Sequence, residues 1–130
     1  MVDVLIKTDS HYTVNRHKIR DIVKDFLAEK KVKSHAEVSI SIVGDRMMKK
    51  LNKKFRNLDE TTDVLSFPLN DEKKGSDYID APDGILRLGD IIISYPQVIE
   101  EATEDNVMVD DKINELVVHG LLHLMGQHHE

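Results

Sequence analysis

The chain of 130 residues contains no cysteine, which excludes both a disulfide framework and a metal site built from thiolates. It also lacks any apolar run near the roughly 20 residues that a membrane-spanning helix requires. The first residues show no basic region followed by a long apolar stretch, so we expect no signal peptide, no membrane association and a cytoplasmic location. Without internal repeats or low-complexity tracts, the length predicts a single domain over residues 1–130.

Aromatic residues are also scarce, at 5% of the chain, so base stacking is expected to contribute little to any binding of nucleic acid. The net charge of −6 argues against a general nucleic-acid coat protein. However, residues 1–70 carry 14 Lys and Arg against 10 Asp and Glu, whereas residues 71–130 carry 4 against 14. The basic residues are densest from Arg46 to Arg56, with no acid among them. This stretch suits a polyanion backbone, or is simply a solvated helix face.

Strand and helix periodicities alternate along the chain. Strands are predicted at 2–7, 37–43, 63–67 and 85–94, and helices at 14–31, 46–55, 96–104 and 111–125. Residues 70–84, rich in glycine, proline and acids, are predicted to form a loop. The expected fold is α+β (α/β mixed), with a single small mixed β-sheet of about four strands packed with helices and the metal-site helix at the C-terminus.

Some residues predict local features within these elements. The helix at 46–55 is expected to bury one apolar face and to direct its lysines outward; that face comprises Met47, Met48, Leu51 and Phe55. Gly89 inside the last strand suggests a β-bulge. Ser94 and Pro96 suit the start of the helix that follows.

The helix predicted at 111–125 is apolar nearly all round, so it is expected to be buried. It carries His119 and His123, whose spacing places both rings on one helix face. Gly126 then ends the helix, and His129 stands ten residues after the first histidine. This spacing is the ligand pattern of metzincin zinc sites. The sequence thus predicts one zinc ion (Zn2+) per chain on His119, His123 and His129, with His128 as the competing third ligand.

Peptide hydrolysis is the less favoured chemistry for such a site. Zinc peptidases with a His-Glu-x-x-His helix use the Glu beside the first ligand as general base, and Gly120 occupies that position here. Three neutral imidazoles would leave an open coordination position, which is typical of a catalytic rather than a structural zinc. Ser66 lacks the glycine-flanked turn of a serine nucleophile.

Three blocks of sequence resemble the YbeY family of metal-dependent endoribonucleases and rRNA maturation factors. They are residues 52–68 (NKKFRNLDETTDVLSFP), 88–94 (LGDIIIS) and the histidine segment 119–129, which occur in the family's order and span most of the chain. The sequence departs from the family's usual pattern at Gln127 and His128, where an aromatic residue and an Asp are common.

The resemblance implies that His119, His123 and His129 bind zinc and that Arg56 is catalytic. It further implies a zinc-dependent, single-strand-specific endoribonuclease acting in maturation of the small-subunit rRNA 3′ end and in ribosome quality control. Implied partners are single-stranded RNA or rRNA and the small ribosomal subunit or ribosome-associated proteins. The alternatives are a non-catalytic ribosome assembly factor with a structural metal and, less favoured, a metallopeptidase.

The side chain of Arg56 suits the catalytic role that the resemblance implies, because its planar guanidinium can donate two hydrogen bonds to a phosphate. The ordinary alternative for Arg56 is a salt bridge, with Asp59 or Asp63 as partner. Asp63 and Asp90 are expected to support the site or to fix the loops near it.

Overall fold

The structure is a computed structural model that describes residues 1–9, 11–69 and 84–126. Its elements, in chain order, are β1 (Val2–Thr8), α1 (Arg16–Glu29), β2 (His35–Val43), α2 (Asp45–Arg56), β3 (Val64–Pro68), β4 (Ile85–Ser94), α3 (Tyr95–Asp105) and α4 (Val109–Leu124). The strands form one sheet in the order β1-β2-β4-β3, in which β3 alone is antiparallel to its neighbour. The predicted α+β class with one mixed sheet of four strands is confirmed.

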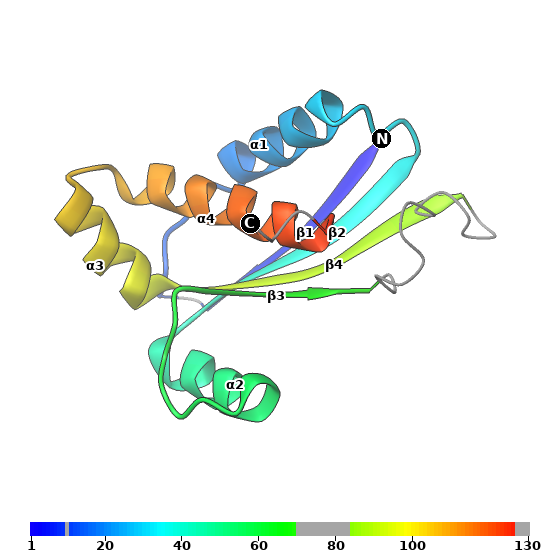
Figure 1. Cartoon of the computed structure of the whole chain (residues 1–130). Helices are drawn as coiled ribbons and strands as arrows, with labels where there is room; N and C mark the ends of the chain where they lie inside the picture. Colours follow the sequence, from blue (N-terminus) through cyan, green and yellow to red (C-terminus); the bar gives the residue numbers. More distant parts are fainter. Residues whose placement is uncertain (10, 70–83, 127–130) are drawn as a thin grey trace.

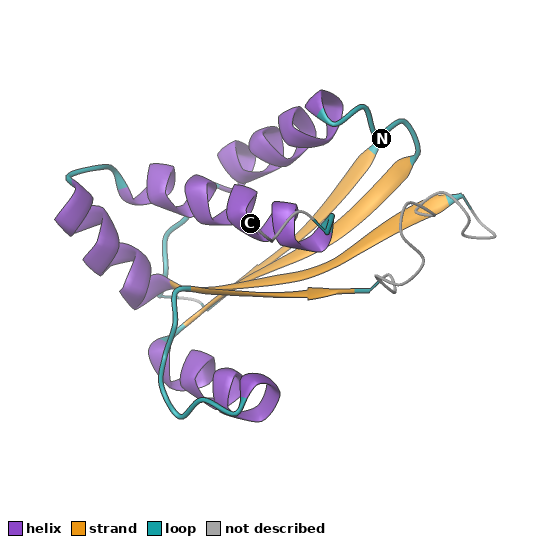
Figure 2. Cartoon of the chain, in the orientation of Figure 1, coloured by secondary structure: helices purple, strands orange, loops and turns teal. Residues whose placement is uncertain are grey.

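Helices α1 and α4 pack together over one face of the sheet, whereas α2 lies on the other side (Figures 1 and 2). The core between α1, α4 and the sheet is built from apolar side chains on alternate strand positions and on one stripe of each helix. Its fully buried members include Ile19, Val23, Leu27, Ala36, Ile40, Ile42, Leu88, Ile91, Ile93, Ile113, Val117 and Leu121. Among the residues that the structure describes, no helix covers most of the opposite sheet face (Figure 2).

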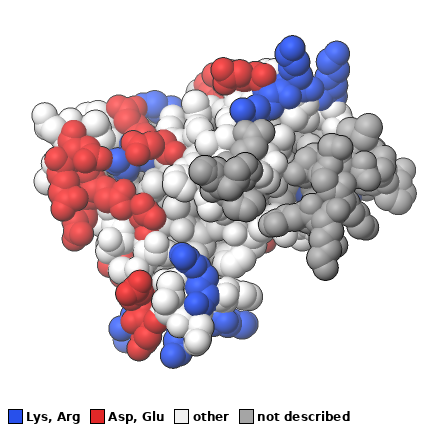
Figure 3. Space-filling view, viewed as in Figure 1, with Lys and Arg blue, Asp and Glu red and all other residues white. Residues whose placement is uncertain are grey.

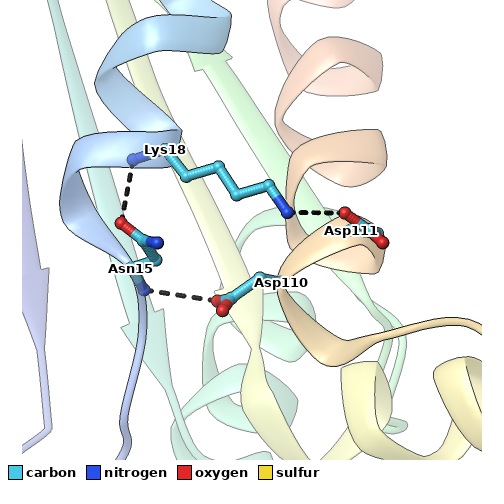
Figure 4. Close-up of polar contacts among 4 residues, drawn as sticks. All are labelled: Asn15, Lys18, Asp110 and Asp111. Carbon is cyan, nitrogen blue, oxygen red and sulfur yellow. Dashed lines mark hydrogen bonds and ion pairs between the residues drawn. The ribbon is translucent and has the colours of Figure 1, made fainter.

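Polar contacts fix the first turn of α4 against the first turn of α1 (Figure 4). The Asn15 side chain caps α1 by accepting a hydrogen bond of 3.0 Å from the backbone N–H of Lys18. The backbone N–H of Asn15 donates to Asp110, and Lys18 Nζ lies 2.7 Å from a carboxylate oxygen of Asp111. These contacts add to the core packing that positions the helix that carries the histidines.

A β-bulge interrupts the pairing of β2 with β4, as Gly89 predicted. The register shifts between Glu37 and Val38, whose partners are Arg87 and Gly89, so that Leu88 is the extra residue. Gly89 has φ of +135°, and a Cβ atom there would lie 2.2 Å from the carbonyl oxygen of Phe67. Only glycine fits this close approach of β4 to β3.

The predicted elements all occur, with ends that differ by at most two residues from those predicted. Ser94 caps α3 with Pro96 in its first turn, as expected. The inner face predicted for α2 is wrong in part, because Met48 is buried with Asn52 whereas Met47 and Phe55 are 47% and 54% exposed. The α2 helix packs at the end of the sheet, where only a narrow apolar stripe is covered.

The loop predicted at 70–84 lies, except for Gly84, outside the described residues. Among the helices of the described ranges, none combines the length and the apolar character needed to cross a bilayer.

Candidate metal centre

A pocket of about 240 Å³ lies where α4 passes β3, at the edge of the sheet. Its lining combines residues from α2, β3 and α4, and consists of Arg56, Val64, Leu65, Ser66, His119, Gly120 and His123. Two histidines and an arginine thus meet at one pocket although more than sixty residues of chain separate Arg56 from His119. This grouping joins two of the three predicted metal ligands to the predicted catalytic residue.

The two histidine rings lie side by side along α4. Their centroids are 5.1 Å apart, as expected for residues one helical turn apart, and their planes are inclined by 30°. Both side chains are exposed, so the expectation that α4 is buried all round is wrong for this stripe. The helix buries only the face that contacts the sheet and α1, and it presents Glu115, His119 and His123 to the outside.

The predicted third ligand, His129, and its competitor His128 lie outside the described residues. The helix ends at Leu124, just before Gly126 as predicted, and Gly126 has φ of +81°, a left-handed conformation that favours glycine. Two adjacent imidazoles on an exposed helix face beside an open pocket suit a zinc or similar divalent ion, which is commonly bound by His pairs four residues apart.

Gly120, which replaces the peptidase glutamate, has a packing reason. A Cβ atom at this position would come within 2.9 to 3.0 Å of three side-chain atoms of Ile91, a residue with no exposed surface. Because Gly120 has no side chain, α4 can lie close to β4. The histidines on either side of Gly120 can then share a pocket with residues of β3. No carboxylate lines the pocket among the described residues.

Arg56 reaches the pocket because the chain after α2 is tied back to the rest of the molecule. The buried Asn52 donates to the carbonyl oxygen of Glu60 at 2.9 Å. At the other end of α2, Asp45 accepts hydrogen bonds from Thr61 at 3.1 Å and from Ser94 at 2.7 Å. These bonds hold α2 and the segment after it against the junction of β4 and α3.

Within the described ranges Arg56 forms no ion pair, so the salt bridge considered with Asp59 or Asp63 is not present there. Its guanidinium is exposed and lines the pocket, where it is available to an anion. The other basic residues of α2 are exposed as well, and Lys and Arg are prominent over this helix in Figure 3, whereas Asp and Glu gather over α3.

The two aspartates that were expected to support the site, Asp63 and Asp90, have different surroundings in the fold. Asp63 precedes β3, and its carbonyl oxygen accepts a hydrogen bond of 2.9 Å from the backbone N–H of Ser94. Asp90 is exposed, between the buried Gly89 and Ile91 of β4, and lines a different pocket on the sheet face opposite α4. Ser66, which was not predicted as a site residue, lines the histidine pocket. The only indication in the sequence is that Ser66 alternates with the apolar Leu65 on β3, which places the two side chains on opposite faces of the strand.

The profile of the family described as "Endoribonuclease YbeY" matches residues 5–130. The chain belongs to the YbeY family.

A protein of Dehalococcoides mccartyi named Endoribonuclease YbeY is 36% identical over 135 residues, covering 99% of this chain and 78% of that protein. Another of the same name, from Moorella thermoacetica, is 41% identical over 121 residues, covering 91% of this chain and 72% of that protein. Among solved structures, the solution structure of TM1509 from Thermotoga maritima is similar with a TM-score of 0.60 and 28% identity, covering 98% of this chain and 75% of that one.

The described residues of this YbeY family member also contain, away from the histidine pocket, a cluster of side chains of the types that can bind a metal ion. Asp3 on β1 and His35 and Glu37 on β2 offer ligand atoms that all lie within 4.8 Å of one another. The sequence alone does not predict this cluster, because no local spacing connects Asp3 with the other two residues.

The carboxyl group of Glu101, on α3, lies beside that of Asp63 at the entry to β3. Burial, followed by the hydrogen bond and the negative charge of Asp63, raises the pKa of Glu101 to about 7, against 4.5 ordinarily, while Lys112 opposes and Asp105 adds to the rise. Between these two values the folded state holds a proton that the unfolded state has released. The contribution of Glu101 to stability therefore falls as the pH rises from 4.5 to about 7.

We expect Glu101→Gln to flatten this part of the pH dependence, since the amide never ionises beside Asp63. The change in the free energy of unfolding from pH 5 to pH 8 should be more favourable for the variant than for the unmodified protein. The difference should be on the order of 1 kcal/mol after allowance for solvent screening. Urea denaturation at both pH values measures the change. Glu100→Gln, at the exposed neighbouring position, is the control, and equal pH dependence in both variants and the unmodified protein would contradict the assignment.

Proposed function

We propose that the protein is a zinc-dependent endoribonuclease that cleaves single-stranded RNA. The observation that carries the proposal is the meeting of His119 and His123 with Arg56 at one pocket. Membership of a family described as endoribonucleases supplies the reaction class. By the same resemblance we propose a role in maturation of the 3′ end of small-subunit rRNA and in ribosome quality control, in the cytoplasm.

The residues present fit a catalytic zinc ion. His119 and His123 would hold it from α4, and we propose that His129 completes the set of three ligands. When bound, zinc lowers the pKa of a bound water molecule and polarises a phosphoryl oxygen. The exposure of both rings at a pocket leaves room for substrate, as a catalytic site requires and a closed structural site does not.

Arg56 and Ser66 would act on the RNA phosphate. The guanidinium of Arg56 can donate two hydrogen bonds to one phosphate group and offset the negative charge that increases as the phosphodiester is attacked. The hydroxyl of Ser66, on the same pocket wall, can donate to a phosphate oxygen. Both residues thus position the phosphate next to the histidine pair.

The exposed cations of α2 give the proposed substrate a path to the pocket. Lys49, Lys50, Lys53 and Lys54 lie on the helix that ends at Arg56, and all four are exposed. Such a row binds a phosphate backbone without reading bases, so cleavage should weaken steeply with salt and depend little on sequence.

The structure disfavours the peptidase alternative, because a carboxylate base is absent from the described pocket lining and Gly120 is packed against Ile91. An assembly factor with a structural metal is disfavoured by the position of the histidines outside the core. A metal on this exposed helix face is not needed to hold the sheet and helices together.

Arg56→Ala is expected to lower kcat/KM for single-stranded RNA by about 100-fold to 1000-fold, because one charge-stabilising donor is lost. The zinc content should not change, since Arg56 is no ligand. Cleavage of a labelled single-stranded RNA, beside a duplex of the same sequence, measures the effect, and elemental analysis gives the zinc content.

Arg46→Ala is the matched control, because Arg46 is exposed on the first turn of the same helix and lies outside the pocket lining. It should lose only a small part of the activity, through weaker backbone attraction. If zinc-loaded protein leaves RNA intact while it binds ribosomes, the enzymatic proposal is wrong and the assembly-factor alternative takes its place.

A further inference from the structure

The sheet face that lacks α1 and α4 carries a group of ligating side chains at the edge formed by β1 and β2. The parallel register pairs Asp3 with Glu37, and His35 precedes Glu37 by two residues on the same face of β2. Their common face is opposite to that of Ala36, which is completely buried under the helices. The pairing of β1 with β2 therefore holds the backbone at these three residues in place without any metal.

The three side chains already converge. The Nε2 atom of His35 lies 2.7 Å from a carboxylate oxygen of Asp3, and one ligand atom from each residue lies within 4.8 Å of those of the other two. Ligands of a tetrahedral zinc ion at 2.0–2.2 Å stand about 3.4 Å apart. The side chains are 33%, 58% and 40% exposed for His35, Asp3 and Glu37, so small rotations can bring them to that separation.

We propose that Asp3, His35 and Glu37 bind a second divalent transition-metal ion, of which zinc is the representative, with water completing the coordination. Two carboxylates and one neutral imidazole balance the charge of a divalent ion, and this mixed nitrogen and oxygen set suits zinc and its neighbours better than magnesium or calcium. The inference does not depend on the proposed function, because it concerns the opposite face of the sheet.

Arg87 is the competing cation at this site. Its Nε atom lies 3.4 Å from one oxygen of Glu37, a long contact. Because a carboxylate has two oxygens, Glu37 can bind Arg87 through one oxygen and the ion through the other. The arginine would then orient the carboxylate toward the ion. Asp3, Glu37 and Arg87 also line a pocket of about 290 Å³ toward which solvent ligands of the ion can point.

An ion at this position would tie β1, an edge strand of the sheet, to β2. Its ligands come together only in the folded state, so zinc binding should raise the thermal stability of the protein by mass action.

The test uses the full chain with His119→Ala and His123→Ala, which removes the α4 pair, and titrates it with zinc by calorimetry. We expect one zinc ion per chain to remain bound, with an affinity that falls at least about tenfold on adding either His35→Ala or Glu37→Gln. His17→Ala is the control: His17 Nε2 lies 3.4 Å from Asp21 on the exposed face of α1, so the variant removes an ordinary His–Asp pair.

A second measurement uses the unmodified protein, so it does not depend on whether the variants fold. Zinc is titrated into this protein and the NMR signals of the histidine rings are monitored. The ring signals of His35 should shift with zinc while those of His17 do not. The proposal is overturned if the double variant binds no zinc, or if His35→Ala and His17→Ala have the same isotherm. Neither result bears on RNA cleavage, which depends on the α4 pocket.

Discussion

His123→Ala is expected to abolish both zinc binding at the α4 pocket and RNA cleavage. With one imidazole of the pair removed, the affinity for zinc at this site should fall by more than about 100-fold. Cleavage should fall by at least about 1000-fold, which corresponds to the several kcal/mol that a metal contributes to the transition state. Because the side chain is exposed, the free energy of unfolding should change by no more than about 0.5 kcal/mol.

The measurements are the loss of one zinc ion per chain by elemental analysis, cleavage of single-stranded RNA and urea denaturation on the same preparation. His119→Ala should behave alike, and His11→Ala, at an exposed histidine beside Asp9, should match the unmodified protein. A chelator should remove the activity, and zinc should restore it. Full cleavage by metal-free protein would contradict the zinc mechanism, and unfolding on chelation would support a structural metal instead.

Gly89→Ala is expected to destabilise the fold by at least about 3 kcal/mol or to prevent folding. The new Cβ atom would lie 2.2 Å from the carbonyl oxygen of Phe67 and 3.0 Å from Cα of Pro68, both backbone atoms that cannot move alone. The φ of +135° adds strain for any residue with a side chain. Since β3 would have to move, the pocket wall at Ser66 should be displaced as well.

Gly84→Ala separates backbone strain from steric overlap. Gly84 also has a positive φ, +72°, but a Cβ atom there meets nothing within 4 Å. This variant should lose only about 1 kcal/mol. Denaturant midpoints and slopes compare the two variants, and equal losses at both positions would show that the approach of β3 to β4 is not what demands glycine.

Local sequence patterns were sufficient wherever the relevant residues are close together in the chain. The one-turn spacing of His119 and His123 placed both rings on one face, and the helix ends just before Gly126, as predicted. Gly89 marked the bulge correctly. Burial was harder to predict, because α4 is apolar on average although the stripe that carries its histidines faces outward.

Residues distant in sequence could not be assigned to the same site by such patterns. Periodicity gives no strand order, so it could not show that Asp90 lies on the face opposite α4 or that Ser66 lines the histidine pocket. The inner face of α2 was overestimated for a related reason, since its apolar stripe alone does not say how much of the helix the sheet covers.

Residue types and short-range spacing were enough to predict the eight elements, the histidine pair, the family resemblance and the absence of thiolate chemistry. Only in the folded chain does Arg56 meet the histidines and does Asp3 join His35 and Glu37. Both groupings arise from the order and direction of the strands, which are fixed by packing of the whole core and not by any one segment.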